Sequence, residues 1–269
     1  MSQSIQQAVE TIIAAVPGAP FAGTVDTIKT GDASQPVRGV VVTFMATAEV
    51  IEKAVQLGAN FIITHEPTFY NHPDKTEWLG QHAAYQAKRN LIDENRIVIW
   101  RFHDYIHSLQ PDPIGLGLLE QLGWEKYAAP DEPHRCTIPP ITFQELGSWV
   151  KKQLGLNEIR AVGDSGMICQ KIALWPGAPG FETQIGALGQ PEVDVLITGE
   201  ISEWETSEYV RDAAHLGFQK GLIITGHAAS EEAGMKRIIP WLQTFLPGTA
   251  ITFVPTGRAI VSLRSTANI

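Results

Sequence analysis

The chain has 269 residues, of which 44% are hydrophobic and 18% are charged, so it is long and apolar enough to bury a sizeable core. Its 20 basic and 29 acidic residues give a formal net charge of −9. This acidic balance argues against nucleic acid or an anionic membrane as the main partner, because both require a basic surface. The sequence also lacks an apolar run of about 18 residues, so no transmembrane helix is predicted.

The first residues, MSQSIQQAVETIIAAVPGAP, predict an amphipathic helix and lack the basic start of a signal peptide. The two cysteines, Cys136 and Cys169, lie far apart and form no CxxC pair. This pattern excludes a zinc site with several thiolates and is typical of a protein of the reducing cytoplasm. We therefore expect a cytoplasmic protein.

Strands and helices are predicted to alternate through the first half of the chain. Short β-branched or apolar runs predict strands, and apolar residues at helical spacing predict the helices between them. The predicted strands cover 40–44, 61–64 and 96–102, and the predicted helices cover 48–57 and 78–90. Strands separated by helices indicate βαβ units and a largely parallel sheet.

The middle of the chain is less regular. Residues 129–140 are rich in proline and polar side chains and predict a connection between two α/β lobes, 1–128 and 129–269, with the C-terminal segment a candidate to pack on the first lobe. Helices are predicted beyond it at 141–155, 182–190, 207–217 and 231–245. Strands are predicted at 159–164, 169–175, 193–199, 221–226 and 250–255.

The two halves of the sequence also repeat a pattern. GANFIITHE is followed by a helix and then by RIVIWRFHDYIH, while EVDVLITGE is followed by a helix and then by KGLIITGHAASE. In this alignment FIITHE matches VLITGE, and Phe102-His103 matches Gly226-His227. The pattern predicts a duplicated α/β unit with mixed, largely parallel sheets, whose two lobes face each other across one site.

Side chains that can bind a metal ion follow several predicted strands, and in a parallel sheet ligands bind beyond the carboxyl ends of the strands. Imidazole and carboxylate ligands without thiolate favour zinc, manganese, iron or cobalt, and two neighbouring ions need bridging carboxylates. The spacing of His227 and Glu231 allows both to reach one ion. The full set comprises His65, Glu66, His103, Asp104, His107, Glu200, His227 and Glu231.

Each of these residues also has a purely structural interpretation. A single histidine after a strand is more often a loop or capping residue than a ligand. Glu66 could be a solvated loop acid, Asp104 a helix cap, and Glu231 an acid favoured in a first helical turn. The joint pattern favours a site, because four of the eight histidines lie at or just beyond predicted strand ends. The other four are interpreted as surface or packing residues, although His72 could support a ligand.

The segments GANFIITHEP, IALWPGAPG, VDVLITGE and LIITGHAASEEAG resemble the NGG-one interacting factor three-like family, also known as GTP cyclohydrolase I type 2-like proteins. The resemblance spans most of the chain. It implies a two-lobed α/β fold, a dinuclear metal site between the lobes, and a homohexamer built from stacked trimers.

By this resemblance, His65 matches the first histidine of the family's His-His pair, and Glu66 replaces the second. His103 matches the histidine that precedes the family's bridging aspartate, and His107 takes that aspartate's place. His227 and Glu231 match the C-terminal ligand pair. The exchanges at 66 and 107 keep the capacity to bind metal but swap the charges, which indicates a divergent branch in which Asp104 or Glu66 could supply the bridge.

These observations lead us to expect a metal-dependent hydrolase-type enzyme with two divalent ions, which would lower the pKa of a bound water. The expected ligands are His65, Glu66, Asp104, His107, His227 and Glu231. Glu200 and His103 are the candidates for a general base or a supporting role. The resemblance implies a small-molecule substrate, with GTP or another nucleotide as the candidate. The alternatives are a non-catalytic metal-binding or regulatory scaffold, and a nucleotide-binding module without metal.

Overall fold

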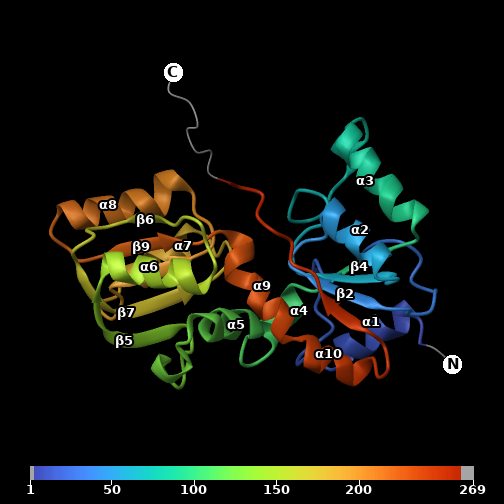
Figure 1. The fold of residues 1–269 in the computed structure, drawn as a ribbon, viewed down its shortest axis with the longest axis horizontal. Helices are drawn as coiled ribbons and strands as arrows, with labels where there is room; N and C mark the ends of the chain where they lie inside the picture. Colours follow the sequence, from blue (N-terminus) through green and yellow to red (C-terminus); the bar gives the residue numbers. More distant parts are fainter. Residues whose placement is uncertain (1–2, 262–269) are drawn as a thin grey trace. The chain divides into compact units, whose positions relative to one another are not determined.

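The computed structural model describes residues 3–261, and the chain divides into two compact units (Figure 1). Within the described residues, the first unit contains 3–114 and 234–256, and the second contains 115–233 and 257–261. The chain leaves the first unit within helix α5 (Pro113–Leu122). Three residues of this helix, Leu118, Leu119 and Leu122, are buried in the core of the second unit. The chain returns to the first unit within helix α9 (His227–Arg237).

A five-stranded sheet forms the centre of the first unit, in the order β1-β4-β3-β2-β10. Four of its strands are parallel, and β1 pairs with β4 in the antiparallel direction. The residues of the three central strands are all buried, as expected for a sheet covered on both faces. The strands are β1 (Ile28–Thr30), β2 (Val40–Thr43), β3 (Phe61–Thr64), β4 (Val98–Arg101) and β10 (Ile251–Phe253).

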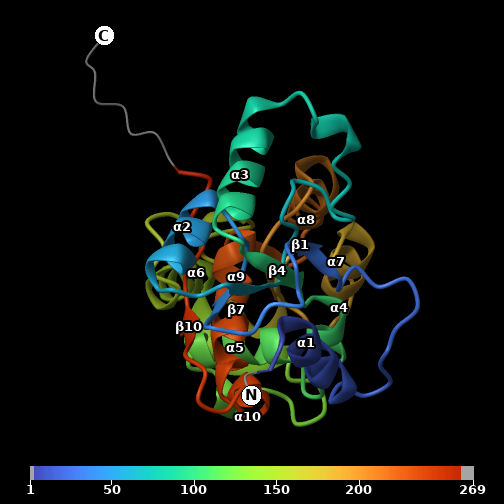
Figure 2. The same cartoon turned by 90° about the vertical axis from the view of Figure 1, so that its right-hand side faces the viewer.

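Helices cover both faces of this sheet (Figures 1 and 2). Alternate strand residues point to opposite faces, so Val42 and Ile63 pack against the helices α1 and α10, whereas Ile62 packs against α2 and α3. A capping box from Ser4 begins α1, and the Thr47 hydroxyl caps α2. The helical segments are α1 (Ile5–Ala14), α2 (Ala48–Gln56), η1 (Glu77–Leu79), α3 (Ala83–Glu94), α4 (Asp104–Ser108) and α10 (Ile239–Phe245).

The second unit has a sheet of the same size, in the order β5-β7-β8-β9-β6. Its three central strands are parallel, and both edge strands are antiparallel to their neighbours. The strands are β5 (Arg135–Thr142), β6 (Arg160–Val162), β7 (Ile168–Trp175), β8 (Val195–Thr198) and β9 (Gly221–Ile224). Besides α5 and α9, the helical segments are η2 (Glu125–Tyr127), α6 (Phe143–Gln153), α7 (Phe181–Leu188), η3 (Glu203–Ser207) and α8 (Glu208–His215).

The prediction of a duplicated α/β unit is confirmed by the order of these elements. Strands β1, β2, β3 and β4 occupy the same sheet positions as β6, β7, β8 and β9, and a helix follows both β4 and β9. The alignment of Phe102-His103 with Gly226-His227 is wrong by one residue, however. Thr64 pairs with Arg101 in the first sheet, and Thr198 pairs with Ile224 in the second. By this register, His103 is equivalent to Gly226 in the repeat.

Several predicted elements differ from the structure. The predicted connection 129–140 is wrong in its second half, because β5 begins at Arg135. Pro139 and Pro140 are tolerated there because β5 is an edge strand whose pairing is irregular between Thr137 and Ile141. The predicted helix 231–245 is two helices, of which α9 begins earlier, at His227. The sequence analysis predicted neither β1 nor α5, and it pointed to α4 only through the interpretation of Asp104 as a helix cap. Among residues 3–261, no helix is long and apolar enough to cross a membrane.

Candidate metal-binding site

Three histidines of the first unit gather beyond the ends of β3 and β4. His65 directly follows β3, His103 is the residue before α4, and His107 lies one turn into that helix. One ring nitrogen of each lies within 4.8 Å of those of the other two. The ring centroids of His65 and His103 are 4.7 Å apart, and each ring is 5.0 Å from that of His107. Three nitrogen ligands at this separation can bind one metal ion.

The tautomers of these histidines follow from their hydrogen bonds. Nδ1 of His65 lies 3.2 Å from the carbonyl oxygen of Phe102. Nδ1 of His103 lies 2.9 Å from Oδ1 of Asp104, and Nδ1 of His107 lies 3.0 Å from Oδ2 of Asp112. Carbonyl and carboxylate oxygens accept, so each Nδ1 carries a proton, and in the neutral form of each ring the lone pair is on Nε2. Metal-binding histidines are usually oriented in this way.

The protonation of His103 also suits a metal ligand. Burial, followed by the nearby charge of His65, lowers the pKa of His103 to about 3, although the hydrogen bond to Asp104 opposes this shift. Its ring is therefore neutral at pH 7, and a neutral imidazole is the form that binds metal ions.

Asp26 and Asp104 hold the first turn of α4 in place. Asp26 accepts hydrogen bonds of 2.8 Å from the backbone N–H groups of His103 and Tyr105. Asp104 also accepts from the Thr24 hydroxyl at 2.8 Å and from the backbone N–H of Val25 at 3.2 Å. Burial raises the pKa of Asp104, but the hydrogen bonds from His103 and Thr24 outweigh it and hold that pKa below its usual value. The carboxylate is therefore ionised at pH 7.

Glu66 lies next to this cluster and is fixed by a buried arginine. Its Oε1 is 3.6 Å from Nε2 of His103, and its Oε2 is 3.4 Å from Nη2 of Arg101. Arg101 is fully buried at the end of β4 and also donates through Nε to the carbonyl oxygen of His65. His72 contacts the same guanidinium through its carbonyl oxygen and through Nδ1. His72 therefore contacts the cation that holds Glu66, and its ring also lies edge-on to that of His103, with the ring centroids 5.6 Å apart.

In the second unit, a histidine and two glutamates meet beyond the ends of β8 and β9. Nε2 of His227 lies 3.1 Å from Oε2 of the buried Glu231, one helical turn further along α9. Nδ1 of His227 lies 3.1 Å from Oε1 of Glu200, which follows β8. This hydrogen bond is the main reason that the pKa of Glu200 lies below its usual value. Glu200 therefore orients the His227 ring.

Two glycines make room for this pair. Gly177 follows β7 with φ +69°, and a Cβ atom there would lie 2.1 Å from Oε1 of Glu231 and 3.2 Å from Nε2 of His227. A Cβ atom on Gly199 would lie 2.6 Å from both the carbonyl oxygen of Gly177 and Oγ of Ser230. Ser230 accepts from the Gly177 N–H and donates to the carbonyl oxygen of His227. Only glycine at position 177 leaves space for the carboxylate of Glu231 beside the imidazole.

Sequence reasoning named the side chains of both groups and gave Glu200 a possible supporting role, but it missed three residues that position the first group. These are Asp26, Arg101 and Asp112. Gly177 lies in the segment IALWPGAPG quoted for the resemblance, but its role in making space for Glu231 was not predicted. The structure places His65, Glu66, His103 and His107 together within the first unit, and Glu200, His227 and Glu231 together within the second.

Comparisons with known proteins agree with the fold and with the sequence motifs. The chain is 26% identical over 221 residues to the GTP cyclohydrolase 1 type 2 homolog of Escherichia coli strain K12, which covers 79% of this chain and 82% of that protein. It is 25% identical over 205 residues to the protein of the same name from Clostridium acetobutylicum, covering 70% and 74% of the two chains.

Solved structures share the fold at lower sequence identity. A Bacillus cereus protein related to NIF3 superimposes with a TM-score of 0.78 at 15% identity, covering 98% of this chain and all of the other. The Staphylococcus aureus protein SA1388 superimposes with a TM-score of 0.73 at 17% identity, covering 97% and 99%. The model of the Duf34/NIF3 (NGG1p interacting factor 3) family matches residues 25–257. The resemblance inferred from the motifs is thus confirmed, and the chain belongs to the Duf34/NIF3 family.

Proposed function

We propose that this protein is a metal-dependent hydrolase with a dinuclear divalent metal centre and a nucleotide as its substrate. The observation that carries the proposal is the group of three histidines whose Nδ1 atoms all bond to oxygen acceptors, which leaves Nε2 as the ligand atom of each. The nucleotide substrate rests on the name GTP cyclohydrolase 1 type 2 homolog that the curated relatives carry.

The proposed ligands come from both units. His65, His103 and His107, with Glu66, form the set of the first unit, and His227 with Glu231 forms the set of the second. Asp104 was predicted as a ligand, but its hydrogen bonds to Thr24, Val25 and His103 favour a role in orienting His103.

Divalent ions bound there would polarise a substrate oxygen and make a water molecule more acidic. The protein's own groups would keep the ligands in their binding form. Arg101 holds one oxygen of Glu66 and so fixes the direction of the other, and Glu200 keeps the Nδ1 proton on His227. A general base that works at neutral pH needs a pKa near 7, so the lowered pKa of Glu200 favours the orienting role over the base.

Metal affinity is the first test. Asp112→Asn removes the carboxylate that orients His107, and losing such a partner typically weakens metal binding about 10–100-fold. Calorimetric titration of chelator-treated protein with zinc, manganese, iron and cobalt would measure the change. Asp131→Asn, at an exposed position in the second unit, is the matched control and should bind metal like the wild type. Equal affinities in the two variants would contradict the proposed histidine site.

Catalysis is the second test. The metal-loaded protein should convert GTP or another nucleotide, and the metal-binding variants should lose this turnover in proportion to their metal content. Binding of metal without turnover of any nucleotide or phosphoester would contradict the hydrolase and support the alternative of a metal-binding scaffold. The homohexamer and the cytoplasmic location remain predictions, which size-exclusion chromatography with light scattering and cell fractionation would test.

A further inference from the structure

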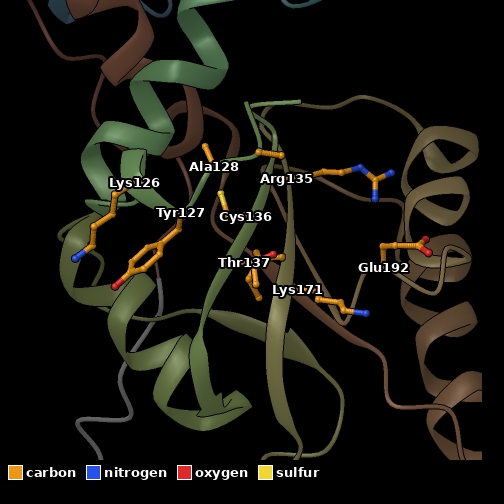
Figure 3. A pocket seen from close by; sticks show the side chains of 10 residues that line it. Lys126, Tyr127, Ala128, Arg135, Cys136, Thr137, Lys171 and Glu192 are labelled. Carbon is orange, nitrogen blue, oxygen red and sulfur yellow. The ribbon is translucent and has the colours of Figure 1, made fainter. Parts of the chain in front are cut away.

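A cavity of about 490 Å³ lies in the second unit, beside the paired strands β5 and β7 (Figure 3). Its volume is in the range of sites for small organic ligands. None of its lining residues belongs to the histidine and glutamate groups described above. The lining consists of Lys126, Tyr127, Ala128, Ala129, Arg135, Cys136, Thr137, Lys171, Ile172 and Glu192.

The strand register brings two cations and a hydroxyl to one face of this sheet. Thr137 pairs with Lys171, so their side chains lie on the same face. Arg135 is two residues before Thr137 and shares that face. Figure 3 shows Arg135, Lys171 and Glu192 extending to the same side of the two strands, whereas Lys126 and Tyr127 lie on the other side. Lys126 is therefore left out of the following charge count.

Opposite charges line this cavity without forming pairs with each other. Within residues 3–261, neither Lys171 nor Glu192 has a side-chain hydrogen bond or an ion pair. Nε of Arg135 is 2.6 Å from Oε2 of Glu132, and its Nη2 donates to the side-chain oxygen of Gln190. Among residues 3–261, Nε has no hydrogen-bond partner, so its contact with Glu132 is an ion pair without a hydrogen bond. The Glu132 side chain is also 54% exposed, so water screens its charge.

The walls of the cavity are fixed by hydrogen bonds. Asp194 accepts from the backbone N–H groups of Gln170 and Lys171, which holds the cationic strand. Lys220 donates to the carbonyl oxygens of Gln190 and Val193, on either side of the segment that carries Glu192. These bonds fix the backbone that carries Lys171 and Glu192, so a ligand has only the side chains of these residues to order.

We propose that this cavity binds a small ligand with two carboxylates and one ammonium group, the charge pattern of an acidic α-amino acid. The two cations Arg135 and Lys171 would each receive a carboxylate, with the Thr137 hydroxyl as a further donor. Glu192 would receive the ammonium group. The net charge of these lining groups, two positive and one negative, is opposite to that of such a ligand.

Calorimetry with three related probes tests this charge pattern on the full chain. L-glutamate should bind in the millimolar range or tighter. Glutarate lacks the ammonium group and L-glutamine lacks one carboxylate, so each should bind at least about tenfold more weakly. Because acidic amino acids also bind metal ions, the protein is treated with chelator, and His65→Ala should bind L-glutamate like the wild type.

Single variants test which group of the ligand contacts Glu192 and which contacts Lys171. Glu192→Gln should abolish the preference for L-glutamate over glutarate, and Lys171→Met should abolish the preference over L-glutamine. Lys152→Met and Glu158→Gln, at exposed positions outside the cavity, are the matched controls and should change neither preference. Thermal unfolding would show that all four variants fold. No saturable binding of L-glutamate, equal binding of the three probes, or equal effects in the controls would overturn the proposal.

Discussion

The two units have the same strand order but present different side chains beyond their strands. After the central strand β3, the first unit places the buried His65, whereas the corresponding position after β8 is Gly199. The end of β4 is the buried Arg101, whereas the end of β9 is Ile224. The same framework therefore supports a charged, histidine-rich strand end in one unit and a closely packed glycine turn in the other.

The comparison shows that the two units position their candidate metal ligands with different contacts, although a carboxylate orients a histidine ring in both. In the first unit, acids and an arginine hold the rings through hydrogen bonds, as Asp112 holds His107 and Arg101 holds Glu66. In the second unit, the absence of a side chain at Gly177 creates space for Glu231 beside His227, and the absence of one at Gly199 lets its turn pack closely against Gly177 and Ser230. Changes at equivalent positions should therefore have different effects in the two units.

The largest difference is expected between Arg101 and Ile224. Replacing Arg101 with leucine leaves Glu66 without its cation in a buried position, and breaking a buried ion pair typically costs about 3–5 kcal/mol. Ile224→Val removes one buried methyl group and should cost about 0.5–1.5 kcal/mol. Urea unfolding of chelator-treated protein would measure both free energies. Similar costs at the two positions would contradict the role assigned to Arg101.

A smaller effect is expected at Gly199. An alanine there would bring Cβ to 2.6 Å from the Gly177 carbonyl oxygen, so the turn must shift, and such overpacking costs about 1–3 kcal/mol. Gly186→Ala is the matched control, because it lies within α7 with no heavy atom within 4 Å of the added Cβ. It should stabilise the protein by up to about 1 kcal/mol. The assignment fails if Gly199→Ala is as stable as the wild type in the same urea experiment.

A pH dependence of the stability is also expected, and it arises from the first unit. The pKa of His103 is about 3 in the folded protein, against an ordinary value of 6.5. Between these values the unfolded chain binds a proton that the folded ring excludes, so stability falls as pH decreases from 6.5 towards 3. In metal-free protein, His103→Gln should reduce this slope. His215→Gln, at an exposed position in α8, should leave it unchanged, and equal slopes in the two variants would contradict the buried neutral ring.

Local sequence patterns predicted the central strands and the side chains that follow them. The run FIIT forms β3 at its predicted limits, because a short β-branched segment between polar residues has few alternatives. The edge strand β5 was missed because its prolines resemble a connection, and only tertiary pairing with β7 makes it a strand. Asp26, Arg101 and Asp112 were missed for a related reason, since their roles depend on contacts with distant segments or on the geometry of a turn.

Metal content per chain is the most direct test of the proposed centre. Protein purified without chelator or a metal-affinity tag would be analysed by plasma mass spectrometry, together with a His65→Ala/His107→Ala variant and with His215→Ala as the control. The proposed dinuclear centre predicts about two divalent ions per chain in the wild type and the control. It predicts loss of metal in the double variant. Absence of bound metal in the wild type, even after incubation with zinc, manganese, iron or cobalt, would contradict it.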